Sequence, residues 1–406
     1  MIKNLETIEQ TLTQLCLRHP ELMRISVKSP SEISTSHPIL DYGYLADFIA
    51  RAWDHTYRSK EGRREVRFHY TPGYLEWLLA SPWLDKNLTG IALDHEERVL
   101  GLSYGINKTL RLGGKSFRIG LHSGLSVAPE YVGKGIAQYI HFNVQKKIVE
   151  SGPSYDGSAY WWDGKNVKRG HSLDTFRRND PLLKFFSYDL LNRIFDYERA
   201  LDNISLIPLQ KPFAKFLSGV PEPRLPHNYQ ILEFASGDLE EVQLFLNEIE
   251  IGELVGRYQF NKEELWRILS FRPRPDDIFT TFCTLLRSDG ALKGALYGYR
   301  TPLVQLNTDQ VMFLDGIWIA PHLDPAIKKA FVAESLRVAY EAYDVYAALT
   351  MKGTFPVENC PRPLFQPVTL PQWIPQKRHF FMGIFAYSQE FDEELKKAQG
   401  FFIDHK

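Results

Sequence analysis

The sequence predicts an α+β fold made of two halves, each a mixed, mostly antiparallel sheet flanked by helices. Segments with alternating apolar residues follow one another as antiparallel meanders, and segments with a helical apolar period interrupt them. The order of these segments in residues 37–205 returns in residues 229–406. A chain of 406 residues is long enough for two or three domains.

The first half begins after an N-terminal helical extension, residues 1–36, in which apolar residues recur with a helical period from Leu5 to Leu15. Helices are expected at 43–53 and 74–79. Three strands are expected at 88–94, 99–108 and 115–127, with Gly113-Gly114 forming the turn between the last two. A helix after residue 135, a strand at 158–162 and a helix near residue 166 complete this half.

A proline-rich linker is expected at 206–228, because five prolines cluster there. The second half then repeats the element order. Strands are expected at 229–234, 278–286, 291–299, 310–319 and 345–349, and helices at 239–249, 262–269 and 325–343.

The segment between the strand ending at Val127 and the helix that follows holds two glycines, Gly133 and Gly135. Glycine lets the backbone turn sharply and approach a ligand closely, because it has no Cβ. The first N–H groups of the helix have no partner within the helix, and the helix dipole favours an anion there. This joint therefore predicts a diphosphate site; the alternative is a tight turn without a ligand.

The residues of this joint are Val127-Ala128-Pro129-Glu130-Tyr131-Val132-Gly133-Lys134-Gly135-Ile136-Ala137. They resemble the acyl-CoA loop of the GNAT acyltransferase superfamily, in which a strand leads through a proline into (Gln/Arg)-x-x-Gly-x-(Gly/Ala) and a helix. The chain departs from that pattern at Glu130 and Val132. The layout is similar to a tandem-GNAT protein. The resemblance implies that acetyl-CoA or another acyl-CoA is a substrate. The residues that it implies contact coenzyme A are Leu125, Ser126, Val127, Val132, Gly133, Lys134, Gly135, Ile136, Ala137 and Asn166.

The same resemblance implies an N-acyltransferase in which an amine attacks the thioester directly and a strand backbone N–H stabilises the oxyanion. Gly124 lies in that strand, and a strand glycine can mark a bulge or a close ligand approach. The alternative is an ordinary sheet glycine that faces a bulky neighbour. The strand carries no Asp or Glu between residues 115 and 127, which leaves His122 as the candidate general base. A buried structural histidine is the alternative. The tyrosine acid expected after Asn166 is absent.

The second half keeps the strand ending Trp318-Ile319-Ala320-Pro321 but has Pro325 and Ile327 in place of the two glycines. Proline has no N–H to offer a phosphate. The sequence therefore predicts a degenerate second domain and one coenzyme A per chain. The alternative to an acyltransferase is a non-catalytic acyl-CoA-binding or interaction protein, since the usual acid and base are missing.

Composition excludes other classes of function. A net charge of −1 gives no global field for nucleic acid or an anionic membrane, and no apolar run is long enough to span one. Three scattered cysteines predict a reducing cytoplasm, and no two histidines have helical metal-ligand spacing, so no metal is expected. The predicted acceptor is a small-molecule or peptide amine. A serine-hydrolase elbow at Gly124-Leu125-Ser126-Val127-Ala128 is disfavoured because no helix follows at once.

Overall fold

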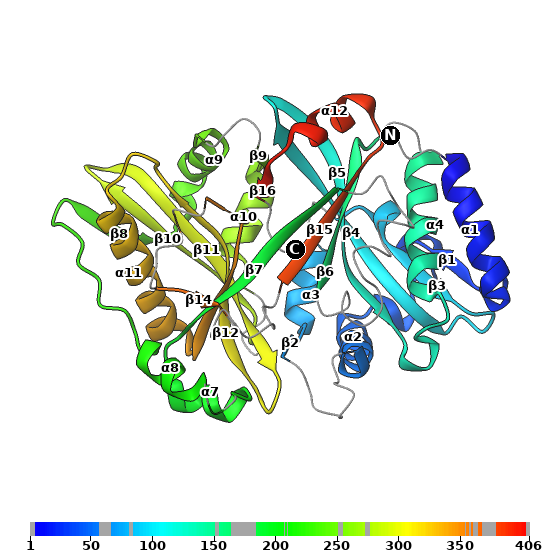
Figure 1. Cartoon of the computed structure of the whole chain (residues 1–406), viewed down its shortest axis with the longest axis horizontal. Helices are drawn as coiled ribbons and strands as arrows, with labels where there is room; N and C mark the ends of the chain where they lie inside the picture. Colours follow the sequence, from blue (N-terminus) through cyan, green and yellow to red (C-terminus); the bar gives the residue numbers. More distant parts are fainter. Residues whose placement is uncertain are drawn as a thin grey trace.

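The computed structural model describes residues 5–56, 66–80, 84–150, 154–163, 184–206, 208, 210–250, 255–272, 277–353, 355–356, 359, 364–367 and 379–402. Within these residues one extended sheet crosses the whole molecule, with helices packed against it (Figure 1). Most neighbouring strands are antiparallel, and three pairs are parallel. The predicted α+β class with a mixed, mostly antiparallel sheet is confirmed.

The first half follows the predicted order. Its helices and strands are α1 (Leu5–Arg18), β1 (Ser26–Lys28), α2 (Tyr42–Thr56), β2 (Arg67–Phe68), α3 (Pro72–Leu79), β3 (Gly90–Leu93), β4 (Val99–Leu112), β5 (Lys115–Val127), α4 (Ile136–Glu150), β6 (Gly157–Asp163), β7 (Lys184–Ile194) and α7 (Tyr197–Asn203). Short 3-10 helices lie at Pro20–Arg24, Pro30–Glu32, Pro38–Leu40, Lys86–Leu88 and Pro129–Tyr131. The helix predicted near residue 166 lies outside the described residues.

The second half begins after a further helix, α8 (Gln210–Leu217), which lies inside the segment predicted as a linker. Its elements are β8 (Tyr229–Glu233), α9 (Leu239–Glu248), β9 (Val255–Tyr258), α10 (Lys262–Ser270), β10 (Thr280–Ser288), β11 (Ala291–Val304), β12 (Thr308–Ile319), α11 (Pro325–Tyr343), β13 (Ala347–Lys352), β14 (Gln366–Pro367), β15 (His379–Ala386), α12 (Gln389–Lys397) and β16 (Gly400–Phe402). The predicted domain boundaries remain a prediction.

Across the sheet the strand order is β1-β3-β4-β5-β6-β15-β7-β13-β12-β11-β10-β8. The last long strand of each half pairs with the other half, since β15 joins β6 and β7 joins β13. Figure 1 shows β7 and β15 side by side at the centre of the molecule. Two shorter strands cross over as well: β2 pairs with β11, and β9 with β4. The two halves are thus joined along their sheets rather than by one linker.

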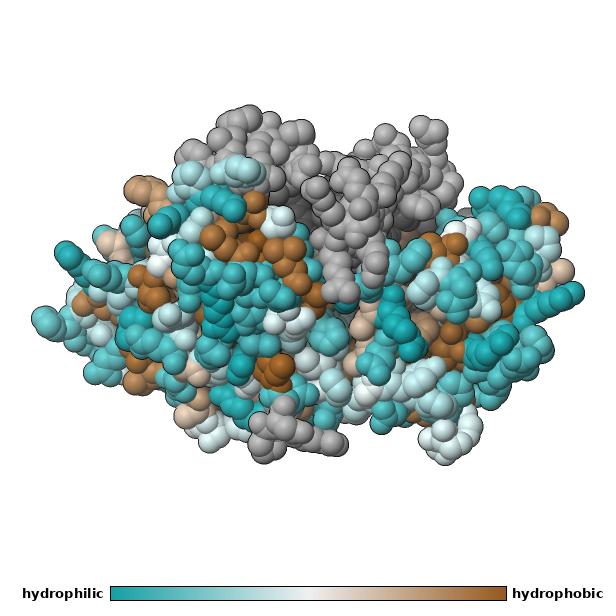
Figure 2. All heavy atoms as spheres, turned by 90° about the horizontal axis from the view of Figure 1, so that it is seen from below, coloured by the Kyte–Doolittle hydropathy of each residue, from teal (hydrophilic) through white to brown (hydrophobic). Residues whose placement is uncertain are grey.

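The core is apolar on both faces of the central strands. A small cluster under α1 and α4 includes Ile136, Ile140 and Val144, and a larger one fills the rest of both halves. A buried ion pair between Lys108 of β4 and Glu264 of α10 links the halves, with both side chains almost fully covered. On the face drawn in Figure 2, hydrophobic residues form small patches separated by hydrophilic ones.

A candidate acyl-CoA site in the first half

The glycine loop joins the short 3-10 helix at Pro129–Tyr131 to helix α4. Gly133 and Gly135 have φ values of 84° and 77°, in the left-handed region that favours glycine. A Cβ on Gly133 would have no heavy atom within 4 Å, so the loop faces open space there. A Cβ on Gly135 would lie 3.0 Å from Cδ2 of His19. The two glycines therefore bend the chain. A ligand can approach the backbone at Gly133, whereas Gly135 packs against His19.

The start of α4 suits an anion. Its first intrahelical bond runs from the N–H of Tyr139 to the carbonyl of Gly135, at 2.9 Å. Gly135 precedes the helix and has no side chain with which to cap it. The early N–H groups, from Ile136 onward, are thus left for a ligand or solvent, and the helix dipole adds to the attraction of a negative group.

Strand β5 has a bulge next to this loop. In the β4–β5 ladder Leu102 faces Ser126 and Tyr104 faces Ser123, so Gly124 and Leu125 together oppose one residue, Ser103. Gly124 has a φ of 63°. The bulge suggested by the lone strand glycine is confirmed. A bulge leaves a backbone group unpaired and can re-aim it, which is what an oxyanion donor requires.

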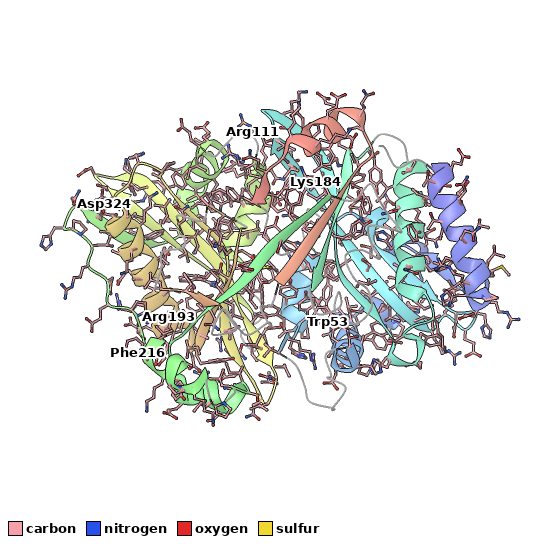
Figure 3. The ribbon with its side chains drawn as sticks, viewed as in Figure 1. Trp53, Arg111, Lys184, Arg193, Phe216 and Asp324 are labelled. Atoms are coloured by element: carbon pink, nitrogen blue, oxygen red, sulfur yellow. The ribbon has the colours of Figure 1, made fainter. Side chains whose placement is uncertain are left out.

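Strands β5 and β6 separate at the same level. Their parallel ladder runs from Ile119–Gly157 to His122–Tyr160 and stops there, while β6 continues to Asp163 against β15. Residues 123–127 of β5 therefore pair with β4 on one side and with no described strand on the other. The indole N–H of Trp53, from α2, donates to the carbonyl of Leu125 across 3.4 Å (Trp53 is labelled in Figure 3).

His122 lies below this opening rather than in it. Its side chain is 3% exposed and stacks on Tyr160 with ring centroids 4.5 Å apart. Burial lowers its pKa to about 3, although a hydrogen bond with the backbone of Leu88 opposes the shift. An imidazole with that pKa is a weak proton acceptor at neutral pH. The geometry gives more support to a packing role, and the assignment of His122 as the general base remains a prediction.

The other residues predicted to contact coenzyme A differ in how exposed they are. Leu125 and Val132 are exposed, at 43% and 48%. The amine of Lys134 lies 4.7 Å from the ring centre of Tyr131. Ser126 and Ile136 are buried, so only their backbone can meet a ligand. The Ser126 hydroxyl donates to the carbonyl of Gly124 at 2.9 Å and is 1% exposed in total, which disfavours the serine-hydrolase alternative. Asn166 lies outside the described residues.

Sequence reasoning missed the aromatic side chains beside the bulge. Trp53 comes from α2, Tyr70 precedes α3 and Tyr104 lies on β4. Trp53 and Tyr70 meet edge to face at 4.7 Å, and Tyr70 stacks on Tyr74 with ring centroids 4.4 Å apart. Burial raises the pKa of Tyr70 and Tyr104, so their hydroxyls stay protonated near neutral pH. Only the folded sheet brings these residues together, and the sequence carries no local signal for it.

The second half has a corresponding bulge but closes the opening with its own side chains. On β12, Asp315 is the extra residue between Leu314 and Gly316, and the β12–β13 ladder ends at Leu314–Thr350. The Thr350 hydroxyl donates to the carbonyl of Leu314 at 3.0 Å, and the Asn359 amide donates to that of Ile317 at 2.9 Å.

The helix that follows, α11, is also capped from within. The Asp324 carboxylate accepts the N–H of Ala326 at 2.7 Å (Asp324 is labelled in Figure 3, in the other half from Trp53). An anionic side chain already occupies the place where α4 leaves its N–H groups open. Two features therefore distinguish the second half from the first: the side-chain cap at the start of α11 and the absence of the two glycines.

Within the described residues, no group of three or more His, Cys, Asp and Glu side chains is placed to hold a metal ion. In the same residues no helix combines the length and apolar character that crossing a membrane requires.

No family model matches the chain, and no curated protein matches it in sequence. Solved structures do. A Saccharomyces cerevisiae N-myristoyltransferase with bound myristoyl-CoA is similar at a TM-score of 0.64 and 12% identity, over 90% of this chain and 79% of that one. A second structure of that enzyme with myristoyl-CoA gives 0.61 and 13%, over 89% and 82%. A GCN5-related N-acetyltransferase from Anabaena variabilis also matches, at 0.47 and 9%, over 88% and 72%. The chain therefore shares the fold of that N-myristoyltransferase.

Proposed function

We propose that the protein is an N-acyltransferase that moves an acyl group from acyl-CoA to an amine, with its site in the first half. One observation carries the proposal: the open glycine loop before α4 lies beside the point where β5 bulges and leaves β6. The loop suits a diphosphate, and the gap beyond it suits the thioester arm. The structural neighbours' acyl-CoA complexes support an acyl-CoA as the substrate.

The chemistry needs few side chains. The acceptor nitrogen attacks the thioester carbonyl, the C–S bond breaks and the thiolate of coenzyme A leaves. A backbone N–H at the Gly124–Leu125 bulge would stabilise the oxyanion, a contribution that can reach several kcal/mol when the donor is fixed before reaction. The amine's proton must pass to a base or to water. His122 is the candidate base that the sequence suggests. The acceptor class, a small-molecule or peptide amine, is part of the proposal.

We also propose one coenzyme A per chain, because the second half is a degenerate copy. Pro325 is the first residue of α11, and Asp324 caps that helix. Thr350 and Asn359 take the β12 carbonyls beside the corresponding gap. The second half then braces the first through the exchanged strands β7 and β15.

Cys16 and Cys283 are free thiols, which supports the proposed cytoplasmic location.

Release of coenzyme A thiol from acyl-CoA, measured with and without amino acids, polyamines and peptides, tests the reaction. We expect amine-dependent release that rises with pH as the amine loses its proton, and an acylated product by mass spectrometry. If coenzyme A binds but no acceptor gives turnover, the non-catalytic binding protein is the better account. If coenzyme A does not bind at all, both fail.

A further inference from the structure

A cavity of about 350 Å³ lies in the first half, between strands β3 and β4 and the chain that precedes α2. Most of its lining is aliphatic or aromatic. Ile91 and Leu102 line it from the sheet, Leu45 from α2 and Ile39 from the 3-10 helix before α2. All four side chains are less than 10% exposed. The cavity is at the lower end of the size range of small-molecule sites, and its lining suits an apolar ligand.

The cavity adjoins the bulge through one side chain. Tyr104 lines it, and the same ring lies against Gly124, so closely that a Cβ on Gly124 would overlap it. The Tyr104 ring thus separates the bulge from the cavity and is the one side chain that the two share. This shared ring relates the cavity to the acyl end of the substrate.

The outer wall of the cavity is held by specific contacts. The segment from Pro30 to Leu40 forms it, and the Glu32 carboxylate in this segment pairs with the Lys147 amine of α4 at 2.6 Å. Glu32 also accepts the N–H of Ser29, and the Lys147 hydrogen bond is the main reason that the pKa of Glu32 falls to about 2. His37 is hydrogen bonded to the carbonyl of Glu97 at 2.9 Å. One side of the cavity is thus bounded by a braced segment.

We propose that this cavity holds the acyl chain of the acyl-CoA substrate, so that the preferred acyl group is much longer than acetyl. The inference rests on the proposed function. An acetyl methyl needs a small fraction of 350 Å³, since a water molecule takes about 30 Å³ of the liquid. Lys86, at the exposed margin, is the one charged residue of a lining that is otherwise mostly aliphatic or aromatic. Each buried methylene of a chain gains about 0.8 kcal/mol.

Calorimetry of the full chain with coenzyme A, acetyl-, octanoyl- and dodecanoyl-CoA tests the proposal. We expect affinity to rise with chain length, by up to about four-fold per methylene until the cavity is filled. Dodecanoate without coenzyme A should bind far more weakly, because it lacks the loop contacts. Equal affinity for all the CoA thioesters would overturn the inference and leave the proposed function intact. Free dodecanoate that binds as tightly as its CoA ester, without competing with coenzyme A, would make the cavity a separate lipid site. No binding of any CoA compound would overturn both.

A variant pair locates the chain. Leu45→Phe adds volume inside the cavity, where the space accepts it, and should lower the dodecanoyl-to-acetyl affinity ratio at least ten-fold. Phe48→Trp enlarges a buried residue of the same helix that does not line the cavity, and should keep the ratio. Thermal unfolding checks that both variants fold. If Leu45→Phe does not fold, Ile39→Phe replaces it, and the chain-length series on the unaltered protein decides by itself. An unchanged ratio in a folded cavity variant would contradict the proposal.

Discussion

The Tyr104 ring lies in the space that a side chain on Gly124 would occupy. Gly124 also has a left-handed backbone, with a φ of 63°. Glycine is therefore required at this position for two independent reasons, the backbone angle and the neighbouring ring. This contact fixes the bulge beside the proposed thioester site and relates it to the cavity behind.

Gly124→Ala should destabilise the fold more than an ordinary glycine replacement does. Gly290→Ala is the matched control. Gly290 also has a left-handed φ, 78°, but no heavy atom lies within 4 Å of the position that a Cβ would take there. The control should lose about 1–2 kcal/mol from the backbone angle alone. Gly124→Ala should lose a further ~1–3 kcal/mol, since the ring or the strand must move. Urea unfolding measures both; equal losses would mean that Tyr104 yields freely.

Gly133→Ala should weaken coenzyme A binding, because a methyl group would point into the open space where the diphosphate is proposed to lie. Gly114→Ala is the control: its φ of 76° and empty surroundings match those of Gly133, but it lies in the β4–β5 turn. Both should lose similar stability, and only Gly133→Ala should lose affinity, by at least ten-fold. Similar affinities for the two variants, measured by calorimetry, would remove the loop from the site.

His122 should make stability depend on pH. Its pKa is about 3 in the fold and about 6.5 when the chain is unfolded. Between these values the unfolded chain binds the extra proton, so folding stability falls as the pH falls, by about 1.4 kcal/mol per unit from this group. His122→Phe keeps a ring against Tyr160 and removes the titration, so its stability should fall less steeply from pH 6.5 to 4.

The same variant tests the predicted base. A general base typically contributes at least about 100-fold to the rate. We expect a smaller loss for His122→Phe, in keeping with the burial of the imidazole. A loss of 100-fold or more in kcat, with stability at neutral pH preserved, would restore His122 as the base.

Coenzyme A should bind with a stoichiometry of one per chain. The α11 start offers a capped helix and no flexible glycine pair, so it lacks the open N–H groups of α4. Calorimetric titration should give one equivalent in the unaltered protein and no residual strong site in Gly133→Ala. Two equivalents would refute the degenerate second half.

Local features of the sequence predicted much of the site. The apolar periods of β5 and α4 and the two loop glycines are local patterns that can be seen in the sequence. The strand, the helix and the glycine turn all lie where the sequence predicted them. Gly124 suggested either a bulge or a bulky neighbour, and the structure has both, since the Tyr104 ring packs against this glycine. The loop's role in binding remains a prediction, and so does that of Asn166.

Non-local features could not be predicted. Nothing in the alternation of β7 or β15 shows that each joins the opposite half, because both faces of central strands are buried and either partner would satisfy them. His122 stands on the more polar face of its strand by sequence, yet α4 and β6 bring Gln145 and Tyr160 together on that side. Alternation assigns residues to two faces but does not show which face meets solvent.

A crystal structure of the full chain with a non-hydrolysable thioether analogue of dodecanoyl-CoA tests the central claim most directly. We predict one analogue per chain. Its diphosphate should contact the loop backbone from Val132 to Ala137, and its sulfur end should lie beside Gly124 and Leu125, with no analogue at Asp324. An analogue bound at α11, or bound in the first half away from both the loop and the bulge, would contradict the account.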